Sequence, residues 1–337
     1  MRGEAIASAI LTVNPEANKT KSYSNAVQEK KKKQVDIDCQ STIWSVAFLA
    51  DGNHIVSGGD DRKIRRWGVQ DGKEAGGPIE GGPAVLSMEI SQNGKWVVCG
   101  ALRGRVVVWD AESGKKVAEF KAHKKSVAAA DVSPDAKKIV TGSYDTTLCV
   151  WSLSTGQRLL GPFKHNKTVA AAKFSPDGRL ISTASDSVRI YDSLDGRLLV
   201  DCPVQVSSFK NQALTWVGDS KQLFALSVDG DIHCLDLNTG KTVSKWTIHS
   251  SHEPRCISLA SNGTFIAASA NSSVSFWDTT THKQIGSIVH HPAHVASIAI
   301  STNSRIVVGG GRKITLQTLL DILPSPYVAS HVSESAA

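Results

Sequence analysis

Residues 122–192 read AHKKSVAAADVSPDAKKIVTGSYDTTLCVWSLSTGQRLLGPFKHNKTVAAAKFSPDGRLISTASDSVRIYD, and this stretch contains one sequence unit twice. In each copy a histidine precedes an apolar run, Ser-Pro-Asp, a second apolar run, an acidic turn and an aromatic residue. His123 recurs as His165, and Ser133-Pro134-Asp135 recurs as Ser175-Pro176-Asp177, in both cases 42 residues later. A fixed period of this length predicts a repeat architecture.

The same period extends to both sides of this stretch. Successive apolar runs end, at intervals of 40 to 44 residues, in Trp67, Trp109, Trp151, Tyr191, Leu235 and Trp277. Asp-Gly, Ser-Gly or Thr-Gly pairs follow the first five and place glycines at Gly72, Gly114, Gly156, Gly196 and Gly240. Such pairs supply the positive φ that tight hairpins need. A seventh, weaker unit follows in VASIAIS, RIVVGGG and KITLQTL, without a closing aromatic residue.

Composition limits the class of protein. The chain has 337 residues, 41% of them hydrophobic, which is enough to bury one large core or an array of repeats. No apolar run approaches the ~20 residues that cross a bilayer, and Glu4 argues against a signal peptide. Six cysteines are scattered without CxxC pairs, which predicts buried, reduced thiols, no metal site and a cytoplasmic protein.

The net charge of +7 is concentrated at the N-terminus. Residues 1–33 lack strand alternation or a sustained helical stripe, and we expect a disordered basic tail. Its run Lys30, Lys31, Lys32 and Lys33 has two interpretations. It could act in nuclear import or in contacts to RNA or acidic lipid, or it could be a solvated segment that keeps the neighbouring strand soluble.

The residues after this tail predict how the repeat array ends. Val35, Ile37 and Cys39 alternate with polar residues, which is a strand signal. The seventh unit has no obvious fourth strand, and residues 34–39 can supply it, which would close the ring and remove two exposed sheet edges. We therefore expect an all-β, seven-bladed β-propeller of four-stranded antiparallel blades over residues 34–320. Residues 321–337 are expected to form a flexible tail.

These features resemble the WD-repeat family over nearly all of residues 34–320, and in overall impression the chain is similar to WD-repeat proteins of fungi. Trp109-Asp110 and Trp277-Asp278 retain the dipeptide that names the family. The resemblance implies a network of a loop histidine, a strand hydroxyl, a turn aspartate and a tryptophan in each blade. The third unit matches this tetrad fully, with His123, Thr141, Asp145 and Trp151.

The other units match the tetrad in part. The first has Cys39 in place of the histidine, the second has Cys99 and Arg103 at the hydroxyl and acid positions, and the seventh offers His291. The remaining matches and departures are His165, Thr183, Asp186 and Tyr191 in the fourth unit, Ala225, Asp229 and Leu235 in the fifth, and Asn271 and Trp277 in the sixth.

Two chemical roles are alternatives to this structural role. His, Thr and Asp are the parts of a hydrolytic triad, but each hydroxyl would lie in mid-strand under a tryptophan, away from oxyanion donors. His290, His291 and His294 could ligate a metal, but no cysteine or acid accompanies them. One loop-anchoring histidine and two exposed ones are expected instead. No carboxylate cluster is expected in the central channel, so neither enzymatic activity nor a cofactor is predicted.

The resemblance also implies a binding surface. In WD-repeat relatives, the residue that enters the innermost strand of each blade points toward the channel mouth, and the residue before each turn acid faces the same rim. By register these residues are Trp44, Leu86, Ala128, Ala170, Gln212, Arg255 and Ala296, together with Asp60, Leu102, Tyr144 and Ser185. Trp44 and Arg255 are of the types favoured in binding hot spots, although Trp44 could instead pack on a neighbouring blade.

The expected function is that of a non-catalytic, monomeric scaffold that binds proteins or peptides on this rim. The six residues of this rim that we expect to contact a partner are Trp44, Asp60, Leu86, Tyr144, Gln212 and Arg255. The alternative is a propeller associated with nucleic acid or ribonucleoprotein that contacts phosphates only through the N-terminal tail with its Lys30 to Lys33 run. Such binding would weaken steeply with salt. The expected location is the cytoplasm, with the nucleus as the alternative. No membrane association of the propeller is expected.

Overall fold

The computed structural model describes residues 34–79, 82–206, 213–217, 220, 222–248, 259–261 and 263–328. The chain divides into two units, residues 1–33 and residues 34–337, and only the second contains described residues. The predicted basic tail with Lys30, Lys31, Lys32 and Lys33 therefore lies outside the described residues, as do Gln212 and Arg255. Within the described ranges, no helix is both long and apolar enough to cross a membrane.

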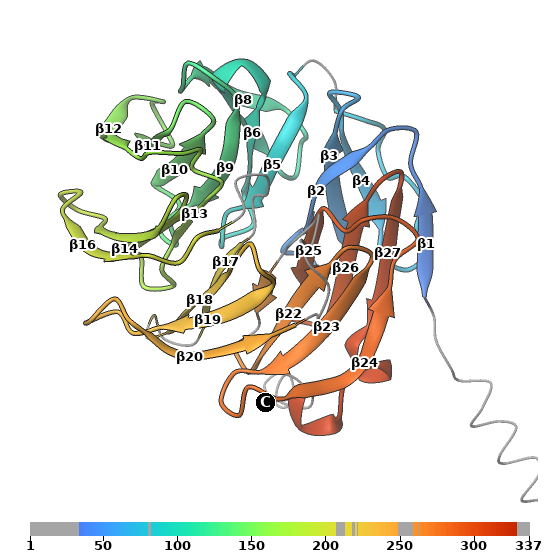
Figure 1. The fold of residues 1–337 in the computed structure, drawn as a ribbon. Coiled ribbons are helices and arrows are strands. Elements are labelled where there is room, and N and C mark those ends of the chain that lie inside the picture. Colours follow the sequence, from blue (N-terminus) through green and yellow to red (C-terminus); the bar gives the residue numbers. More distant parts are fainter. Residues whose placement is uncertain are drawn as a thin grey trace, which may run out of the picture. The chain divides into compact units, whose positions relative to one another are not determined.

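Seven antiparallel sheets are arranged in a ring around a common axis (Figure 1). The first three sheets in chain order are β2–β4 (Ile43–Phe48, His54–Gly59, Ile64–Gly68), β5–β8 (Val85–Ile90, Trp96–Ala101, Arg105–Asp110, Lys116–Lys121) and β9–β12 (Val127–Val132, Lys138–Ser143, Thr147–Ser152, Arg158–Lys164). The next three are β13–β16 (Ala171–Phe174, Leu180–Ala184, Val188–Asp192, Leu198–Cys202), β17–β20 (Leu214–Val217, Gln222–Leu226, Asp231–Leu235, Thr242–Thr247) and β21–β24 (Leu259–Ser261, Phe265–Ala270, Ser273–Asp278, Gln284–His290). The seventh sheet consists of β25–β27 (Ser297–Ile300, Arg305–Gly310, Lys313–Thr318) joined by β1 (Val35–Asp38). The predicted fold class is correct.

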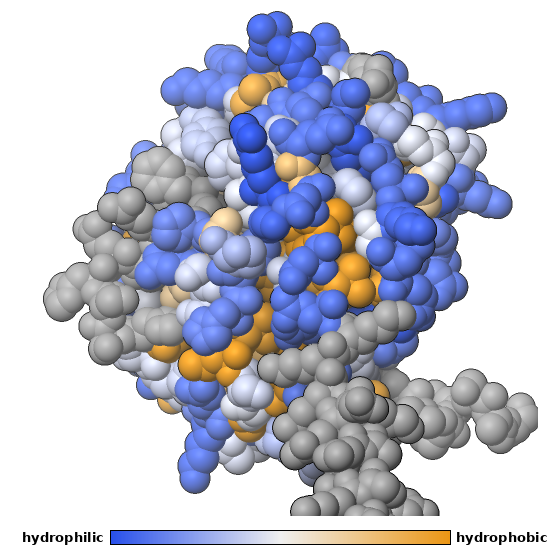
Figure 2. All heavy atoms as spheres, turned by 90° about the vertical axis from the view of Figure 1, so that its right-hand side faces the viewer, coloured by the Kyte–Doolittle hydropathy of each residue, from blue (hydrophilic) through white to orange (hydrophobic). Residues whose placement is uncertain are grey.

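β1 forms the outermost strand of the seventh sheet. It pairs antiparallel with β27, from Val35 opposite Leu316 to Asp38 opposite Lys313. Ile37 is buried in a cluster that contains residues of both the seventh and the first sheets. The predicted pairing of this strand with the seventh unit is confirmed. Hydrophilic side chains cover most of the surface on the side that carries β1, with hydrophobic areas between them (Figure 2).

The first sheet departs from the predicted four strands. It has three strands, and the segment that follows β4 makes only isolated bridges, between Trp67 and Glu74 and between Ile64 and Ile79. Gly76 and Gly77, with φ of 79° and 72°, interrupt the extended backbone between these bridges. Positive φ at two successive residues is incompatible with a strand, which explains the missing fourth strand.

Hydrophobic clusters fill the spaces between neighbouring sheets. Phe120 of β8 packs on Trp151 of the next sheet, with ring centroids 5.3 Å apart, and Phe163 of β12 packs in the same way on Tyr191, at 5.2 Å. Gly156 lies beneath Phe120, because a Cβ at this position would come within 2.9 Å of the phenyl ring. The turn glycines are therefore required by this packing as well as by their positive φ.

The five described cysteines confirm the prediction of reduced, buried thiols. Cys39, Cys99, Cys149, Cys202 and Cys234 are all buried and free, whereas Cys256 lies outside the described residues. Burial raises the pKa of the Cys39 and Cys149 thiols to about 11. At neutral pH these thiols are protonated and poorly nucleophilic.

The beginning of the predicted flexible C-terminal tail is packed. After β27 the chain forms two short 3-10 helices, η2 (Leu319–Asp321) and η3 (Ser325–Tyr327). The buried residues of this segment join the cluster between the sixth and seventh sheets and are Leu319, Ile322, Leu323 and Val328. The Tyr327 hydroxyl donates a hydrogen bond to Asp278 Oδ2 at 2.7 Å. The prediction of flexibility from residue 321 is therefore wrong as far as Val328, and residues 329–337 lie outside the described residues.

Candidate functional site

The predicted tetrad is assembled in the third sheet. Thr141, in the middle of β10, accepts a hydrogen bond from Trp151 Nε1 at 2.8 Å, and its Oγ1 lies 2.7 Å from His123 Nε2. His123 Nδ1 lies 3.2 Å from both carboxylate oxygens of Asp145 and 3.0 Å from Thr147 Oγ1. Asp145 also accepts from the Lys124 backbone N–H at 2.8 Å. The spacing in the sequence therefore identified four side chains that touch.

Protonation states in the tetrad suit a structural role. Burial lowers the pKa of His123, although Asp145 beside it acts in the opposite direction. Burial works to raise the pKa of Asp145, but hydrogen bonds from Thr147 and Lys124 hold it below its usual range. The His123 side chain is 1% exposed, and both of its ring nitrogens meet partners inside the blade. The network satisfies buried polar groups and presents no open nucleophile.

Replacing Thr141 with valine is expected to lower the free energy of unfolding by about 2 kcal/mol, because the buried Trp151 N–H and the His123 ring both lose their partner. Cys99→Val is a matched control, since Cys99 occupies the same register position in the second sheet and is fully buried. That change should cost less than about 1 kcal/mol. Denaturant unfolding measures both, and equal losses would contradict a specific role of the network.

Other sheets keep fragments of the tetrad. In the first sheet Trp67 Nε1 donates to Ser57 Oγ at 2.9 Å, and Arg65 forms ion pairs with Asp61 and Glu74. In the fourth sheet the Tyr191 hydroxyl lies 3.3 Å from His165 Nε2. Burial lowers the pKa of His165 to about 4. Each fragment joins the strands of its own sheet.

His291 anchors a loop of the seventh sheet. Its Nδ1 lies 3.1 Å from Thr315 Oγ1 and its Nε2 lies 3.1 Å from the Gly310 carbonyl oxygen. His290 and His294 are exposed. The prediction of one loop-anchoring histidine and two exposed ones is confirmed, and the part of the chain that the structure describes contains no group of residues suited to hold a metal ion.

The described rim residues lie at one end of the sheets. Trp44 is the second residue of β2, and its indole Nε1 donates a hydrogen bond of 2.6 Å to Asp60 Oδ1 in the turn after β3. Trp44, Leu86 and Tyr144 are half-buried, and Asp60 is exposed. Burial raises the pKa of the Tyr144 hydroxyl, so it remains a neutral donor. The structure thus joins Trp44 to Asp60, and the hydrogen bond holds the indole within its own sheet.

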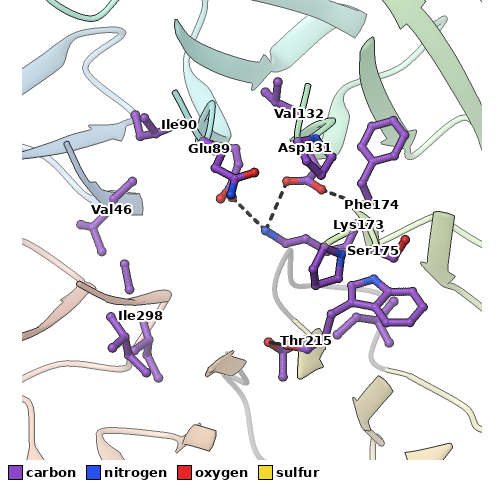
Figure 3. Close-up of a pocket in the computed structure, with 18 residues that line it drawn as sticks. Val46, Glu89, Ile90, Asp131, Val132, Lys173, Phe174, Ser175, Thr215 and Ile298 are labelled. Carbon is purple, nitrogen blue, oxygen red and sulfur yellow. Dashed lines mark hydrogen bonds and ion pairs between the residues drawn. The ribbon is translucent and has the colours of Figure 1, made fainter. Parts of the chain in front are cut away.

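A cavity of about 400 Å³ lies at the other end of the innermost strands. Its wall is charged on one side, with Glu89, Asp131 and Lys173, and apolar on the other, where Val46 and Ile298 lie (Figure 3). These side chains come from five different sheets. The sequence did not predict this cavity, because the expected binding residues lie at the opposite end of the innermost strands.

Lys173 connects three sheets in this cavity. Its Nζ lies 2.9 Å from Glu89 Oε2 and 3.7 Å from Asp131 Oδ1 (Figure 3). The Phe174 backbone N–H donates to the other Asp131 oxygen at 2.7 Å. Burial raises the pKa of Asp131 to about 7, whereas the two carboxylates keep the pKa of Lys173 above its usual value despite burial. The short contact goes to Glu89, so Lys173 is a full cation and Asp131 is the group whose charge burial disfavours.

The prediction that the channel holds no carboxylate cluster is therefore wrong. Glu89 and Asp131 are far apart along the chain, so a search of the sequence for acidic residues close to one another does not detect the pair. The repeat period could have predicted their proximity, because equivalent positions of the innermost strands recur at intervals of 42 residues. These positions are Ala47, Glu89, Asp131, Lys173 and Thr215. In a closed array such positions converge on the axis.

The comparison with protein families agrees with this geometry. The family model for the WD domain, G-beta repeat, matches residues 31–68, 78–110, 114–152, 157–192 and 240–278, together more than half of the chain. The chain therefore belongs to the WD-repeat family. Propellers of this family commonly bind other proteins and are generally not catalytic. A search of curated proteins found no match.

Proposed function

We propose that this protein is a non-catalytic scaffold that binds protein or peptide partners on the rim formed by Trp44, Asp60, Leu86 and Tyr144. The observation that carries the proposal is the hydrogen bond of 2.6 Å that holds the half-buried Trp44 against Asp60. Gln212 and Arg255, which the register places on the same rim, are proposed members outside the described residues. The proposed site has no cofactor.

The energetic reason is that the rim is organised before a partner arrives. A peptide that meets a fixed indole loses less affinity to the ordering of side chains than one that meets a mobile side chain. Tryptophan and tyrosine are also the residue types that carry most of the binding energy in protein interfaces. Leu86 adds apolar area between them, and the Asp60 carboxylate adds a charged group at the edge.

The double variant Trp44→Ala/Tyr144→Ala is expected to reduce the recovery of at least one co-purifying protein by 10-fold or more, since two hot-spot residues are worth about 1.4 kcal/mol or more together. Quantitative mass spectrometry after affinity purification measures this. Thermal melting should change little, because both side chains are half-buried at strand ends.

Trp96→Ala is the matched control. Trp96 is also half-buried and begins β6, at the end of the sheet opposite the rim. If the double variant retains every partner, or if the Trp96 variant loses the same partners, the proposed rim is wrong.

A further inference from the structure

The turn between β6 and β7 carries a charge opposite to that of the equivalent turns on either side. Asp61, Arg103 and Asp145 occupy one position of three successive units, at intervals of 42 residues. Asp61 accepts a hydrogen bond from the Lys63 backbone N–H at 3.2 Å. Asp145 accepts one from the Lys124 backbone N–H at 2.8 Å. A guanidinium group cannot accept such bonds, and Arg103 is exposed instead.

This turn touches the loop between the second and third sheets. The Gly104 carbonyl oxygen accepts a hydrogen bond from the His123 backbone N–H at 3.1 Å. A Cβ at Gly104 would come within 1.9 Å of the His123 carbonyl oxygen and within 2.9 Å of the Lys125 carbonyl oxygen. The close approach therefore requires glycine, and it places Arg103 next to the exposed residues Lys124 and Lys125.

The turn between β10 and β11 joins this loop to the one that follows. The Tyr144 backbone N–H donates to the Ser126 carbonyl oxygen at 3.1 Å. Two residues further along, the Thr146 carbonyl oxygen accepts from the His165 backbone N–H at 2.9 Å. The second loop carries the exposed residue Lys167. One continuous surface therefore crosses the rim end of the second, third and fourth sheets.

Exposed basic residues form a cationic arc on this surface, consisting of Arg103, Lys124, Lys125 and Lys167. None of the four makes an ion pair with any residue that the structure describes. Arg189 of the fourth sheet, by contrast, pairs with Asp201 at 3.0 Å. Asp145 lies within the arc, but its carboxylate is engaged by the His123 ring and by backbone N–H groups. The arc therefore retains a net positive charge.

We propose that the cationic arc binds the acidic side chains of an extended segment of a partner protein. This inference rests on the proposed function and names the chemical class of the partner that the rim binds. Leu102, which is 40% exposed, precedes Arg103, and the half-buried Tyr144 lies between the two lysine-bearing loops. A segment in which carboxylates alternate with apolar residues matches this arrangement in both charge and hydrophobicity.

A nucleic acid matches the rim less well. Its backbone carries a negative charge on every nucleotide without interruption. The charge of the rim changes sign at the first sheet, where the exposed Asp60 accepts the hydrogen bond from Trp44. A polyanion that continued around the rim would meet this carboxylate, whereas a short protein segment can present an uncharged or basic residue there.

The test uses the full chain and two peptide probes of the same shape that differ in charge. They are acetyl-Ser-Glu-Leu-Asp-Glu-Leu-Asp-Ser-amide and acetyl-Ser-Gln-Leu-Asn-Gln-Leu-Asn-Ser-amide, titrated by calorimetry at about 50 mM NaCl. We expect a Kd on the order of 0.1 mM for the acidic probe and at least 10-fold weaker binding of the neutral one. Raising the salt to about 300 mM should weaken binding of the acidic probe about 5-fold, because exposed charges are screened.

The arc variant Arg103→Gln/Lys125→Gln/Lys167→Gln should weaken binding of the acidic probe about 10-fold, since it removes three exposed ion pairs of modest strength. Arg103→Asp is a second variant that serves if the first misfolds. It introduces the acid that the first and third units carry at this position, and it should weaken binding about 5-fold.

The matched control is Lys115→Gln/Lys137→Gln/Lys241→Gln. It removes the same charge from exposed residues in turns at the opposite end of the sheets. The control should bind the acidic probe as the parent does. A similar loss in the control would show that the net charge of the chain, and not the arc, attracts the probe.

Two further outcomes would overturn the proposal. One is equal binding of the two probes, including no binding of either, or unchanged binding by the folded arc variant, which would place the acidic probe elsewhere, such as on the Lys30 to Lys33 run. The other is an oligouridylate that the parent binds more tightly than the acidic probe and that the arc variant no longer binds, because the occupant would then be a nucleic acid.

The proposed function is judged separately by co-purification. Partners that are lost from the Trp44→Ala/Tyr144→Ala variant but retained by the arc variant would support the rim and refute the arc. Partners retained by the double variant would refute the rim, whatever the two probes show.

Discussion

Replacing Lys173 with methionine is expected to lower the free energy of unfolding by about 3 kcal/mol. The ammonium group is the counter-ion of Glu89 and lies near Asp131, and its loss leaves two acidic groups without a cation, the Asp131 side chain 9% exposed and the Glu89 side chain 31% exposed. Removing one partner of such a cluster generally costs more than the cluster contributes when complete, because an uncompensated charge remains. Urea unfolding at pH 7 measures the loss.

Asp131→Asn is the matched control for this prediction. Asparagine can still accept the hydrogen bond from the Phe174 N–H and removes only the charge. Since burial raises the pKa of Asp131 to about 7, the folded protein holds this proton more tightly than the unfolded chain does. The stability that this provides is complete below about pH 4 and is lost as the pH rises through 7. The variant should therefore gain stability relative to the parent between pH 5 and pH 8.

Two outcomes would contradict this account of the channel. One is a Lys173→Met variant as stable as the parent, which would mean that solvent compensates both acids. The other is an Asp131→Asn variant whose stability relative to the parent does not change with pH. The double variant Glu89→Gln/Lys173→Met should recover part of the stability lost by Lys173→Met, because it removes one of the unpaired acids.

Replacing Ile37 with aspartate is expected to lower the free energy of unfolding by about 4 kcal/mol or more. Ile37 is 4% exposed and packs with Trp67, Ile314 and Leu316, so a carboxylate there is buried without a partner. The change should detach β1 from β27 and expose the edge of the seventh sheet. Thermal unfolding and hydrogen exchange of the β27 amides measure the two effects.

Ile37→Val separates packing from charge. It keeps the apolar contact and removes one methylene group, which typically costs about 1 kcal/mol. An Ile37→Asp variant with full protection of the β27 amides would show that β1 does not hold the seventh sheet together.

The repeat period made most of the fold predictable. The spacing of Trp67, Trp109 and Trp151 located the third strand of each of those units, and the turn glycines located the hairpins after them. The tetrad followed from local spacing, because the partners of Thr141 lie within one unit. Because most units carry the same spacing of aromatic and turn residues, a departure in one unit does not change the predicted fold.

Features that occur in one unit were not predictable in the same way. Gly76 and Gly77 prevent a fourth strand in the first sheet, and the pattern of the other units does not predict this difference. The packing of residues 319–328 depends on space between the sixth and seventh sheets. This space occurs where the seventh sheet has Gln317 as the fifth residue of β27, the place that the aromatic residue Trp277 holds in β23 of the sixth sheet. The contact of Lys173 with Glu89 depends on the convergence of three sheets, which local patterns do not encode.

The pairing of β1 with β27 also has a consequence for biosynthesis. The two strands meet through residues 279 positions apart, such as Asp36 and Thr315. At a translation rate of ~5–20 residues per second, β1 leaves the ribosome roughly 15–60 s before its partner is made. The seventh sheet is therefore completed only after β27 has been synthesised, and a ribosome that stalls before β27 leaves a nascent chain in which Ile37 has no Ile314 to pair with.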